Sequence, residues 1–342
     1  MLIETDFTES VVLPSRSGPV KEMLSVIDTD TWTKVRINSS SLSIIQECPR
    51  KAKYLLHDKW RGSVESPAQL FGSAIHKGLE VFYTGRYEDR KMPSLETMEL
   101  MSFGHKVDGE NEDLLLKATR AFIDKAQPLQ QMPETDKRSI QSGVWLLHNY
   151  FKTYLNDPYV AYSDDAGPFV ERPFSFILWT EPSLQIEYFG TIDLIVKNLD
   201  TGNIVVCDHK TTSVVGSDFF NRLKPNHQYT GYLMGADSCF GIRTDSFMVN
   251  CLQVKEKPKT ARGTPPHFPR QITTRDNADK CEFIEAVVYN VKSYLNMRHR
   301  NEWPLGHVNT CSTYGGCAFL NVCSVPPAIR NNVLQNRFIK GE

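Results

Sequence analysis

Three consecutive segments between residues 168 and 211 limit what this chain can fold into. PFVERPFSFILWT, LQIEYFGTIDLIVKN and NIVVCDHKT are rich in β-branched and aromatic residues, which favour strands. The last two are joined by LDTGN, a sequence typical of a tight turn. We therefore expect the two segments to pair as a hairpin at the centre of a β-sheet.

Helices are expected on both sides of these strands in the sequence. Pro49 should divide the first helical segment, and Ser66 with Pro67 should begin the second. A further strand is expected at SFMVNCLQV, followed by a basic loop over residues 255–270. The fold class is therefore α/β, with a small mixed sheet flanked by helices. Apolar residues at helical spacing predict helices near residues 38–60, 66–83, 110–126, 136–156, 217–236 and 277–298.

Two aspartates and a lysine are brought together by the predicted hairpin. Strand side chains alternate between faces, so Asp208 and Lys210 should share one side while His209 points away, and pairing can place Asp193 beside them. Two carboxylates suit Mg²⁺ or Mn²⁺ bound for phosphodiester hydrolysis, in which a lysine can orient the attacking water. The alternative is an ordinary surface salt bridge between Asp208 and Lys210.

The order of these residues resembles the RecB-like branch of the PD-(D/E)XK nucleases. The matching motifs are a helical His76, Asp193, the run Asp208, His209 and Lys210, and QYTGY from Gln228 to Tyr232. The resemblance spans about residues 38–325 and implies a restriction-endonuclease-like core. It further implies the following roles: His76, Asp193 and Asp208 as metal ligands together with the main-chain carbonyl of His209, Lys210 as the catalytic lysine, and Gln228 and Tyr232 near the metal and the DNA strand.

Each of these assignments has a structural alternative. His76 can be a hydrogen-bonded core histidine, and Gln228 and Tyr232 can be ordinary helix surface and core. Glu80 shares the helical face of His76 and is expected to be a solvated charge. Glu171 matches a strand glutamate found in some of these nucleases, but the sequence assigns it no role.

The cysteines are unevenly distributed. Three of the eight lie in CSTYGGCAFLNVC as Cys311, Cys317 and Cys323, which indicates metal or cluster ligation with one ligand supplied from elsewhere. The family resemblance implies that Cys48, in a Cys-Pro-Arg-Lys run, completes a 4Fe-4S cluster, as in AddB-type subunits and CRISPR adaptation nucleases. A zinc site is the alternative, and the five-residue gap between Cys311 and Cys317 departs from the two-residue gap of many members.

The resemblance also sets the expected domain boundaries. Residues 1–35 are predicted to be an N-terminal arm and residues 331–342 a C-terminal tail. Residues 36–330 would form a single RecB-like nuclease domain, with the metal-site core at about 168–255. The cluster would join the helical N-terminal portion to the cysteine-rich C-terminal portion.

Charge is balanced overall but locally segregated. The formal net charge of −1 excludes a generally basic coat, yet residues 255–275 carry a local excess of +5 and residues 50–61 an excess of +4. Such segments can neutralise DNA phosphates, with His267 and Phe268 stacking on a single strand. The alternative is a solvated basic loop.

Together these features predict a divalent-metal-dependent deoxyribonuclease. Exonuclease action on DNA ends in recombination, repair or replication is expected by analogy, either alone as in phage systems or with a separate helicase or strand-annealing protein. The alternative is an inactive DNA-binding or scaffolding subunit. Without a secretory signal or an apolar run of about 20 residues, we expect an intracellular protein in the cytoplasm of a prokaryotic or phage-infected cell, with no membrane partner.

Overall fold

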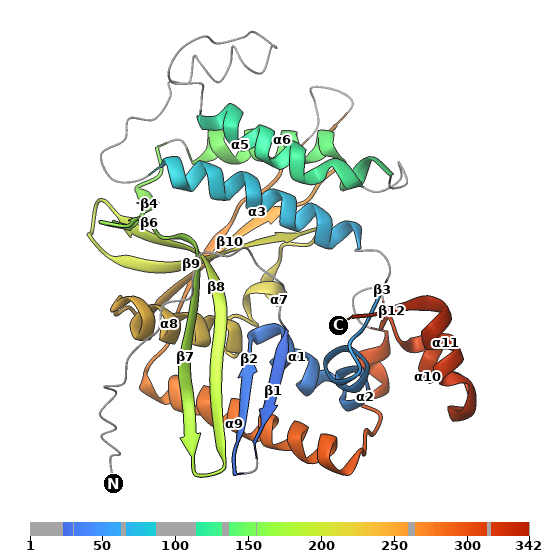
Figure 1. The fold of residues 1–342 in the computed structure, drawn as a ribbon. Helices are drawn as coiled ribbons and strands as arrows, with labels where there is room; N and C mark the ends of the chain where they lie inside the picture. Colours follow the sequence, from blue (N-terminus) through green and yellow to red (C-terminus); the bar gives the residue numbers. More distant parts are fainter. Residues whose placement is uncertain are drawn as a thin grey trace.

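One mixed sheet organises the chain, as the strand-forming segments predicted. The computed structural model describes residues 23–29, 31–62, 66–86, 114–131, 137–154, 156–258, 264–312 and 316–341. Within this part, eight strands form a sheet with the main order β1-β2-β8-β9-β10-β11, and β4 and β7 also pair with β8 (Figure 1). These strands are β1 (Leu24–Asp28), β2 (Thr33–Ile37), β4 (Tyr159–Ala161), β7 (Val170–Glu181), β8 (Leu184–Asn198), β9 (Ile204–Thr212), β10 (Ser246–Gln253) and β11 (Arg270–Thr274).

The direction of the strands makes the sheet mixed. β2 runs parallel to β8 and β9 runs parallel to β10, whereas the other neighbours are antiparallel. The predicted hairpin is confirmed: β8 and β9 pair from Lys197 to Leu194, and Asn198 donates its N–H to the carbonyl of Asn203 across the turn. Gly202 has a φ of +74° in this turn, a conformation that glycine adopts readily. The sheet is larger than the small one predicted.

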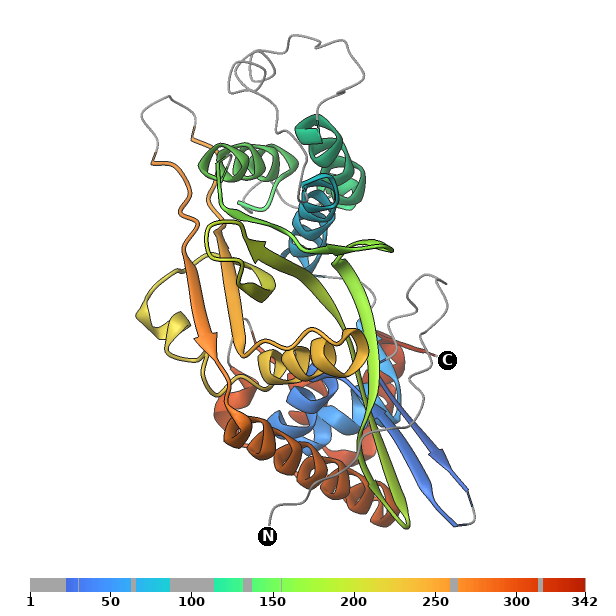
Figure 2. The ribbon, with the colours of Figure 1, turned by 90° about the vertical axis from the view of Figure 1, so that its left-hand side faces the viewer.

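Helices cover both faces of the sheet (Figure 2). One face packs against α3, α5 and α6, and the other packs mainly against α1, α8 and α9, so the sheet separates two apolar cores. The restriction-endonuclease-like arrangement of a central mixed sheet between helices is therefore present. The helices are α1 (Ser39–Glu47), α2 (Pro49–Ala52), α3 (Pro67–Gly85), α5 (Leu114–Ala126), α6 (Ile140–Thr153), α7 (Ser217–Phe220), α8 (His227–Phe240), α9 (Asn277–Arg300), α10 (Leu320–Cys323) and α11 (Arg330–Arg337).

Local sequence signals explain several helix boundaries. Pro49 divides α1 from α2 as predicted, and a π-helical turn, η1 (Lys53–His57), continues from α2. Ser66 caps α3 in a reciprocal capping box with Gln69. The single helix predicted over residues 217–236 is wrong, because Pro225 interrupts it and Asn226 caps a new helix, α8.

The predicted N-terminal arm and C-terminal tail both contain regular structure. β1 and β2 form a hairpin that joins the sheet through β2 and β8, which corrects the arm prediction for the described residues before 36. The tail forms α11 and then β12 (Phe338–Lys340), which pairs with β3 (Trp60–Gly62). The β2–β8 and β3–β12 pairings are long-range contacts, which local composition does not encode. The β3–β12 pairing brings the C-terminal segment beside the N-terminal helices (Figure 1).

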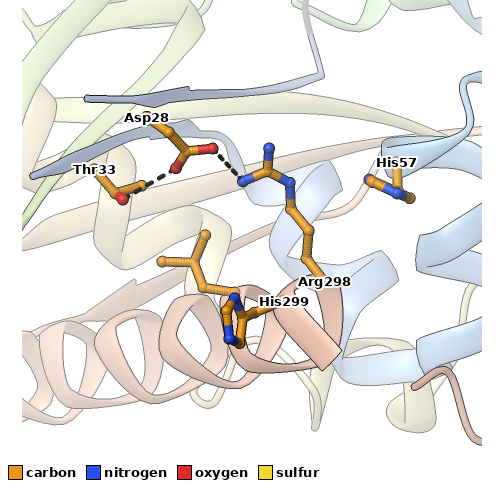
Figure 3. A pocket seen from close by; sticks show the side chains of 6 residues that line it. Asp28, Thr33, His57, Arg298 and His299 are labelled. Carbon is orange, nitrogen blue, oxygen red and sulfur yellow. Dashed lines mark hydrogen bonds and ion pairs between the residues drawn. The ribbon is translucent and has the colours of Figure 1, made fainter. Parts of the chain in front are cut away.

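A cavity of about 510 Å³ lies between the β1–β2 hairpin and the end of α9 (Figure 3). Arg298 points into it and pairs with Asp28 at 2.7 Å, and Asp28 also accepts a hydrogen bond from Thr33. The guanidinium charge in this cavity is therefore already compensated.

In the described residues, no helix is long and apolar enough to cross a membrane.

Candidate metal centre

The site begins where β8 and β9 separate. Their ladder pairs Leu194 with Cys207 and goes no further, so the next main-chain groups of β9 lack partners on β8. The Asp193 carboxylate supplies one such partner, because its Oδ2 accepts a hydrogen bond from the His209 N–H at 2.9 Å. The predicted meeting of the two acidic segments is therefore achieved by a side chain that replaces a main-chain acceptor.

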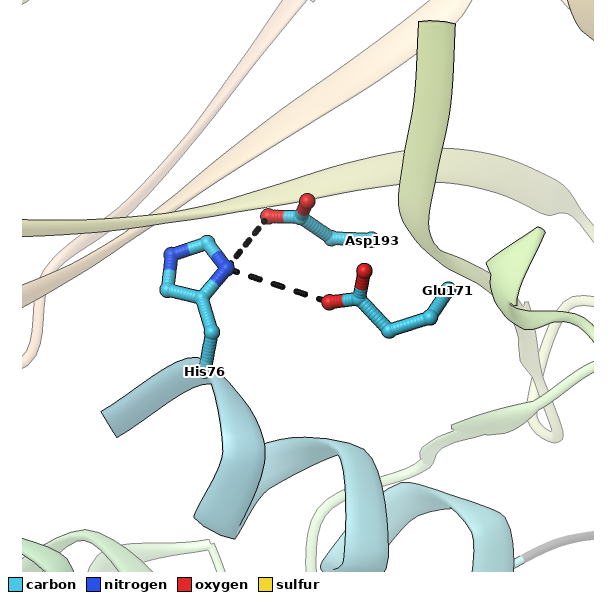
Figure 4. A group of neighbouring side chains, drawn as sticks. All are labelled: His76, Glu171 and Asp193. Carbon is cyan, nitrogen blue, oxygen red and sulfur yellow. Dashed lines mark ion pairs between the residues drawn. The ribbon is translucent and has the colours of Figure 1, made fainter. Parts of the chain in front are cut away.

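His76 reaches the same point from α3. Its Nε2 lies 2.8 Å from the His209 carbonyl oxygen, to which it can donate. Its Nδ1 lies 3.4 Å from Asp193 Oδ2 and 3.9 Å from Glu171 Oε1 (Figure 4). The ligand atoms of His76, Glu171 and Asp193 all lie within 4.8 Å of one another, so this group could hold a metal ion.

Glu171 is the member of this group to which the sequence assigned no role. It lies in β7 between Val170 and Arg172, which pair with β8, but has no register partner itself. Its φ of +48° is in the left-handed region, which non-glycine residues adopt rarely and often at functional sites. No local sequence signal predicts this backbone irregularity, which accompanies the approach of the Glu171 carboxylate to His76.

Asp208 and Lys210 share one face of β9, as the alternation predicted. Lys210 Nζ lies 3.0 Å from Asp208 Oδ1 and 2.8 Å from Oδ2. Gln228, in the first turn of α8, donates from Nε2 to Asp208 Oδ1 at 3.1 Å and accepts from Lys210 at 3.4 Å. The amide of Gln228 therefore bridges the carboxylate and the ammonium group.

The electrostatics of the centre favour a bound cation. The pKa of Asp208 is raised to about 6, because burial and the Asp193 charge together outweigh the lowering effect of Lys210. Burial likewise raises the pKa of Asp193. Burial lowers the pKa of His76, but Asp193 and Glu171 outweigh it and raise that pKa to about 9. Asp208 Oδ2 is buried without a hydrogen bond from the described residues, although Lys210 lies near it. These residues fit a divalent cation.

The sequence as a whole matches one family. A model of the PD-(D/E)XK nuclease superfamily matches residues 36–324. The chain belongs to this superfamily. Its members are nucleases that use divalent metal ions such as Mg²⁺, and membership implies DNA as the substrate.

Two solved structures are similar to this chain at low identity. A proposed exonuclease from Eubacterium rectale is 12% identical with a TM-score of 0.43, covering 80% of this chain and 85% of that one. The protein SSO0001 is 13% identical with a TM-score of 0.29, covering 58% of this chain and 84% of that one. No curated protein matches the sequence.

A cavity of about 320 Å³ opens beside the candidate metal centre. Its lining includes His76 and Glu171 from the centre, Lys77 and Glu80 from α3, and Lys125 from α5. Lys77 pairs with Glu80 at 2.8 Å, so Glu80 is engaged in a salt bridge at the rim. The centre is therefore open to solvent on the side of α3.

Tyr232 approaches the candidate metal centre from the core. Its ring packs edge-on against Phe174 and near Phe247, and only 8% of the residue is exposed. Burial raises the pKa of Tyr232, and the charges of Asp208 and Asp193 raise it further. Tyr232 therefore lies near Asp208 and Asp193, but a buried ring does not line a surface where a DNA strand could lie.

The basic segment 255–275 differs from the prediction. Arg275 is buried, and Arg270 is half-buried and pairs with Asp157, so neither contributes to a DNA-binding surface. Phe268 is 6% exposed and packs in the core, so it cannot stack on a single strand. Lys259 and Arg262 lie outside the described residues. Composition could not reveal these partners because they come from distant parts of the chain.

The basic segment 50–61 is also largely engaged. Lys51 pairs with Glu47 at 2.6 Å and Lys53 pairs with Asp58 at 2.7 Å. Arg50 donates to the main-chain carbonyl of Trp303 at 3.4 Å. Glu47 offsets one charge of the predicted excess of +4, because Asp58 is already included in that count.

The four cysteines of the predicted cluster come together between α1–α2 and the C-terminal segment. Gly306 donates its N–H to Cys48 Sγ at 3.3 Å. Burial raises the pKa of the Cys317 thiol, and the nearby Cys311 and Cys48 raise it further. Burial also raises the pKa of Cys323, which Cys317 and Cys48 influence in the same direction. All four are free thiols that are neither fully buried nor fully exposed.

Proposed function

We propose that this chain is a RecB-like exonuclease that hydrolyses phosphodiester bonds at DNA ends with a bound Mg²⁺ or Mn²⁺. The observation that carries the proposal is that His76 and Asp193 both contact the main chain of His209 in β9, between Asp208 and its ion-pair partner Lys210. These are the residue types that the superfamily's chemistry requires. Their raised carboxyl pKa values are those expected of a centre that awaits a cation.

The ligands would be His76 and Asp193, which lie with Glu171 in the group that could hold a metal ion. Asp208, whose charge acts on both His76 and Asp193, and the carbonyl of His209 would complete the set. In the described residues, His76 uses Nε2 for the His209 carbonyl, which leaves Nδ1 facing the carboxylates. When bound, the ion would lower the pKa of a water molecule and neutralise charge on the attacked phosphate.

Lys210 would orient the attacking water and stabilise charge on the phosphate. Burial lowers its pKa, but Asp208 and Asp193 outweigh this effect and raise it, so the ammonium group is charged at neutral pH. Gln228 fixes the positions of the Lys210 ammonium group and the Asp208 carboxylate through its two hydrogen bonds. Tyr232 would act as a packing support on the core side.

Preference for DNA ends rests on the RecB-like motif order, and it is testable directly. We would incubate the protein with Mg²⁺ or Mn²⁺ and DNA labelled at either end, in single-stranded, duplex and closed circular forms. We expect mononucleotides or short products from linear DNA, circular DNA left intact, and no products from Asp193→Ala. Equal activity of the wild type and Asp193→Ala would refute the site, and efficient cleavage of circles would replace exonuclease by endonuclease action.

We also propose that Cys48, Cys311, Cys317 and Cys323 hold a 4Fe-4S cluster. Arg50 lowers the pKa of Cys323 against the effect of burial, and Lys51 does the same for Cys317. Four neighbouring thiols flanked by two cations suit a group of net negative charge. A zinc ion on four thiolates carries negative charge as well, so absorbance decides: we expect a brown protein with a broad visible band and about four irons per chain.

The cluster would join segments that are already in contact. β3 pairs with β12, and Tyr54 packs with Phe319 and Leu334. The cluster would close the loop between Cys48 and Cys311. The lost chain entropy of the unfolded state gives an upper bound of about 5 to 6 kcal/mol for the resulting stabilisation, and the existing contacts make the real gain smaller. Melting curves of protein with and without the cluster would test the structural role, since identical curves would contradict it.

A further inference from the structure

His209 belongs to two clusters at once. Its main chain lies in the candidate metal centre, where the N–H donates to Asp193 and the carbonyl accepts from His76. Its side chain points away from Asp208 and Lys210, toward α3, where it is 3% exposed and its ring centroid lies 6.0 Å from that of His76. There the imidazole stacks on Tyr83, with ring centroids 5.5 Å apart.

The hydrogen bonds around the imidazole have a fixed direction. An arginine only donates, so the bond from Arg270 Nε at 3.1 Å identifies Asn250 Oδ1 as the acceptor. The Asn250 Nδ2 therefore donates, to Tyr150 OH at 2.7 Å and to His209 Nδ1 at 2.8 Å. Because His209 Nδ1 accepts this hydrogen bond, it carries no proton, and the imidazole is held in one orientation.

Arg270 anchors this cluster to the elements around it. Its guanidinium pairs with Asp157, lies 3.5 Å from the centre of the Tyr154 ring, and donates at 3.2 Å to the hydroxyls of Tyr83 and Tyr150. The residues therefore come from α3, α6, β9, β10, β11 and the segment before β4. We call His209, Asn250, Arg270, Tyr83 and Tyr150 the β9 anchor.

The anchor is linked to both sources of ligands in the candidate metal centre. Tyr83 and His76 are seven residues apart in α3, so they face β9 two turns apart on the same side of the helix. His209 lies between Asp208 and Lys210 in β9. A shift of the His209 side chain would therefore move the carbonyl to which His76 donates and the N–H that holds Asp193.

We propose that the β9 anchor positions the metal ligands, through the side chain of His209, and so sets the affinity of the centre for its divalent ion. This inference rests on the proposed nuclease function, because it assumes that the ion binds at His76, Asp193 and Asp208. His209 acts as a positioning residue: its imidazole does not touch the ion but fixes the main-chain groups that meet the ligands. Outer partners of metal ligands typically change metal affinity by 10- to 100-fold when they are lost.

The test compares two substitutions of His209 that leave its main chain in place. His209→Leu removes the acceptor for Asn250, whereas His209→Asn keeps one, because Asn Oδ1 branches from the chain where histidine Nδ1 does. Mn²⁺ binding to the metal-free proteins is measured by the loss of the free-ion electron paramagnetic resonance signal, without any need for activity. We expect roughly tenfold weaker binding by His209→Leu and recovery to within about threefold of the wild type by His209→Asn.

Two controls separate the possible causes. Val291→Ala creates a cavity in the other core, where Val291 is fully buried, and should lower the melting temperature while Mn²⁺ binding stays unchanged. Asp208→Ala should lose Mn²⁺ binding. If Asp208→Ala binds Mn²⁺ like the wild type, the proposed metal site fails. If Asp208→Ala loses binding but His209→Leu keeps wild-type affinity, the positioning inference alone is overturned.

A milder variant covers the case in which His209→Leu does not fold. Tyr150→Phe removes one hydroxyl, which accepts from Asn250 and from Arg270, and keeps the ring. We expect Mn²⁺ binding to weaken by roughly threefold, less than the full loss of an outer partner. Wild-type affinity in a folded Tyr150→Phe protein would contradict the inference.

Discussion

Strand β9 carries a buried polar cluster on each of its faces, and the two clusters satisfy their polar groups differently. On the face toward α3 and α6, Asn250 makes hydrogen bonds through both its oxygen and its nitrogen, and Arg270 is paired with Asp157. On the other side, the buried Asp208 Oδ2 has the Lys210 ammonium 2.8 Å away as its ion-pair partner, and the charge of Asp193 acts on the same two groups. The same strand therefore carries one hydrogen-bonded network and one site where two buried carboxylates lie close to a lysine.

Burial acts on both clusters, so burial alone does not explain the contrast. Burial and the charge of Asp193 raise the pKa of Asp208, Lys210 and His76 lower it, and the result is a pKa of about 6. Burial also lowers the pKa of His209, which lies among donors and aromatic rings and stays neutral. A neutral satisfied network holds a backbone in place, whereas crowded carboxylates favour the arrival of a cation. We interpret the first cluster as a support and the second as the site it supports.

The largest difference between the clusters should appear in activity. Lys210→Met removes the ammonium group next to Asp208 and should lower the rate of DNA cleavage by roughly 10³-fold while the fold is retained. The measurement is single-turnover cleavage of end-labelled DNA at saturating Mg²⁺. Lys292→Met, which removes a surface lysine paired with Glu181, is the control and should cleave normally. Loss of activity in both variants would point to misfolding.

The next largest effect should appear in stability. Arg270→Met leaves the buried Asp157 carboxylate and the Asn250 oxygen without their partner, so we expect a loss of about 3 to 5 kcal/mol in the free energy of unfolding. Urea denaturation of the metal-free protein measures it. Arg243→Met is the matched control, because Arg243 pairs with Asp237 at the surface, with 89% of its side chain exposed. A loss below about 1 kcal/mol would contradict the view that the network is a support.

Metal affinity should depend on pH because of His76 at the candidate metal centre. The pKa of His76 is raised to about 9, so near pH 7.5 the imidazole is protonated and must release a proton to bind the ion. Affinity should therefore increase with pH up to about 9, by at most roughly tenfold per unit. Calorimetry in buffers of different ionisation enthalpy would count the proton. A pH-independent affinity between 7 and 9 would show that His76 is not a ligand.

The same shift predicts how stability varies with pH in the metal-free protein. A histidine pKa raised in the folded state stabilises it fully below the ordinary value of 6.5, and this contribution is lost as the pH rises through about 9. Wild-type stability should therefore fall between pH 6.5 and 9 more steeply than that of His76→Gln. Parallel stability curves would contradict the raised pKa.

The smallest effect should come from Glu171. Its carboxylate is 3.9 Å from His76 Nδ1 and a third of its side chain is exposed, so it is the outermost of the three grouped ligands. Glu171→Gln should weaken Mn²⁺ binding by less than about tenfold, and Glu181→Gln, on the same strand, should leave binding unchanged. Complete loss of binding would make Glu171 a principal ligand.

Local patterns predicted the elements of the candidate site, and long-range pairing decided the rest. Alternation along β9 was enough to place Asp208 with Lys210 and to turn His209 away. The hairpin turn was equally local. In contrast, the position of Asp193 depends on the point at which β8 leaves β9, and nothing in the sequence marks that point.

Two residues show why the remaining predictions failed. Glu171 reaches the site through a backbone conformation with a φ of +48°, which a non-glycine residue adopts only when the surrounding fold imposes it. Arg270 was counted as a DNA-binding cation, but its partner Asp157 lies 113 residues earlier in the sequence. Charge counts along a segment cannot detect a pair formed across the fold.

The location of the metal ion is the most direct test of the proposed centre. Crystals of the protein soaked in Mn²⁺ would be measured at a wavelength where manganese scatters anomalously. We expect a peak in contact with His76, Asp193 and Asp208, at the point where β8 and β9 separate. A manganese peak elsewhere in the molecule, with none at these three residues, would contradict the assignment.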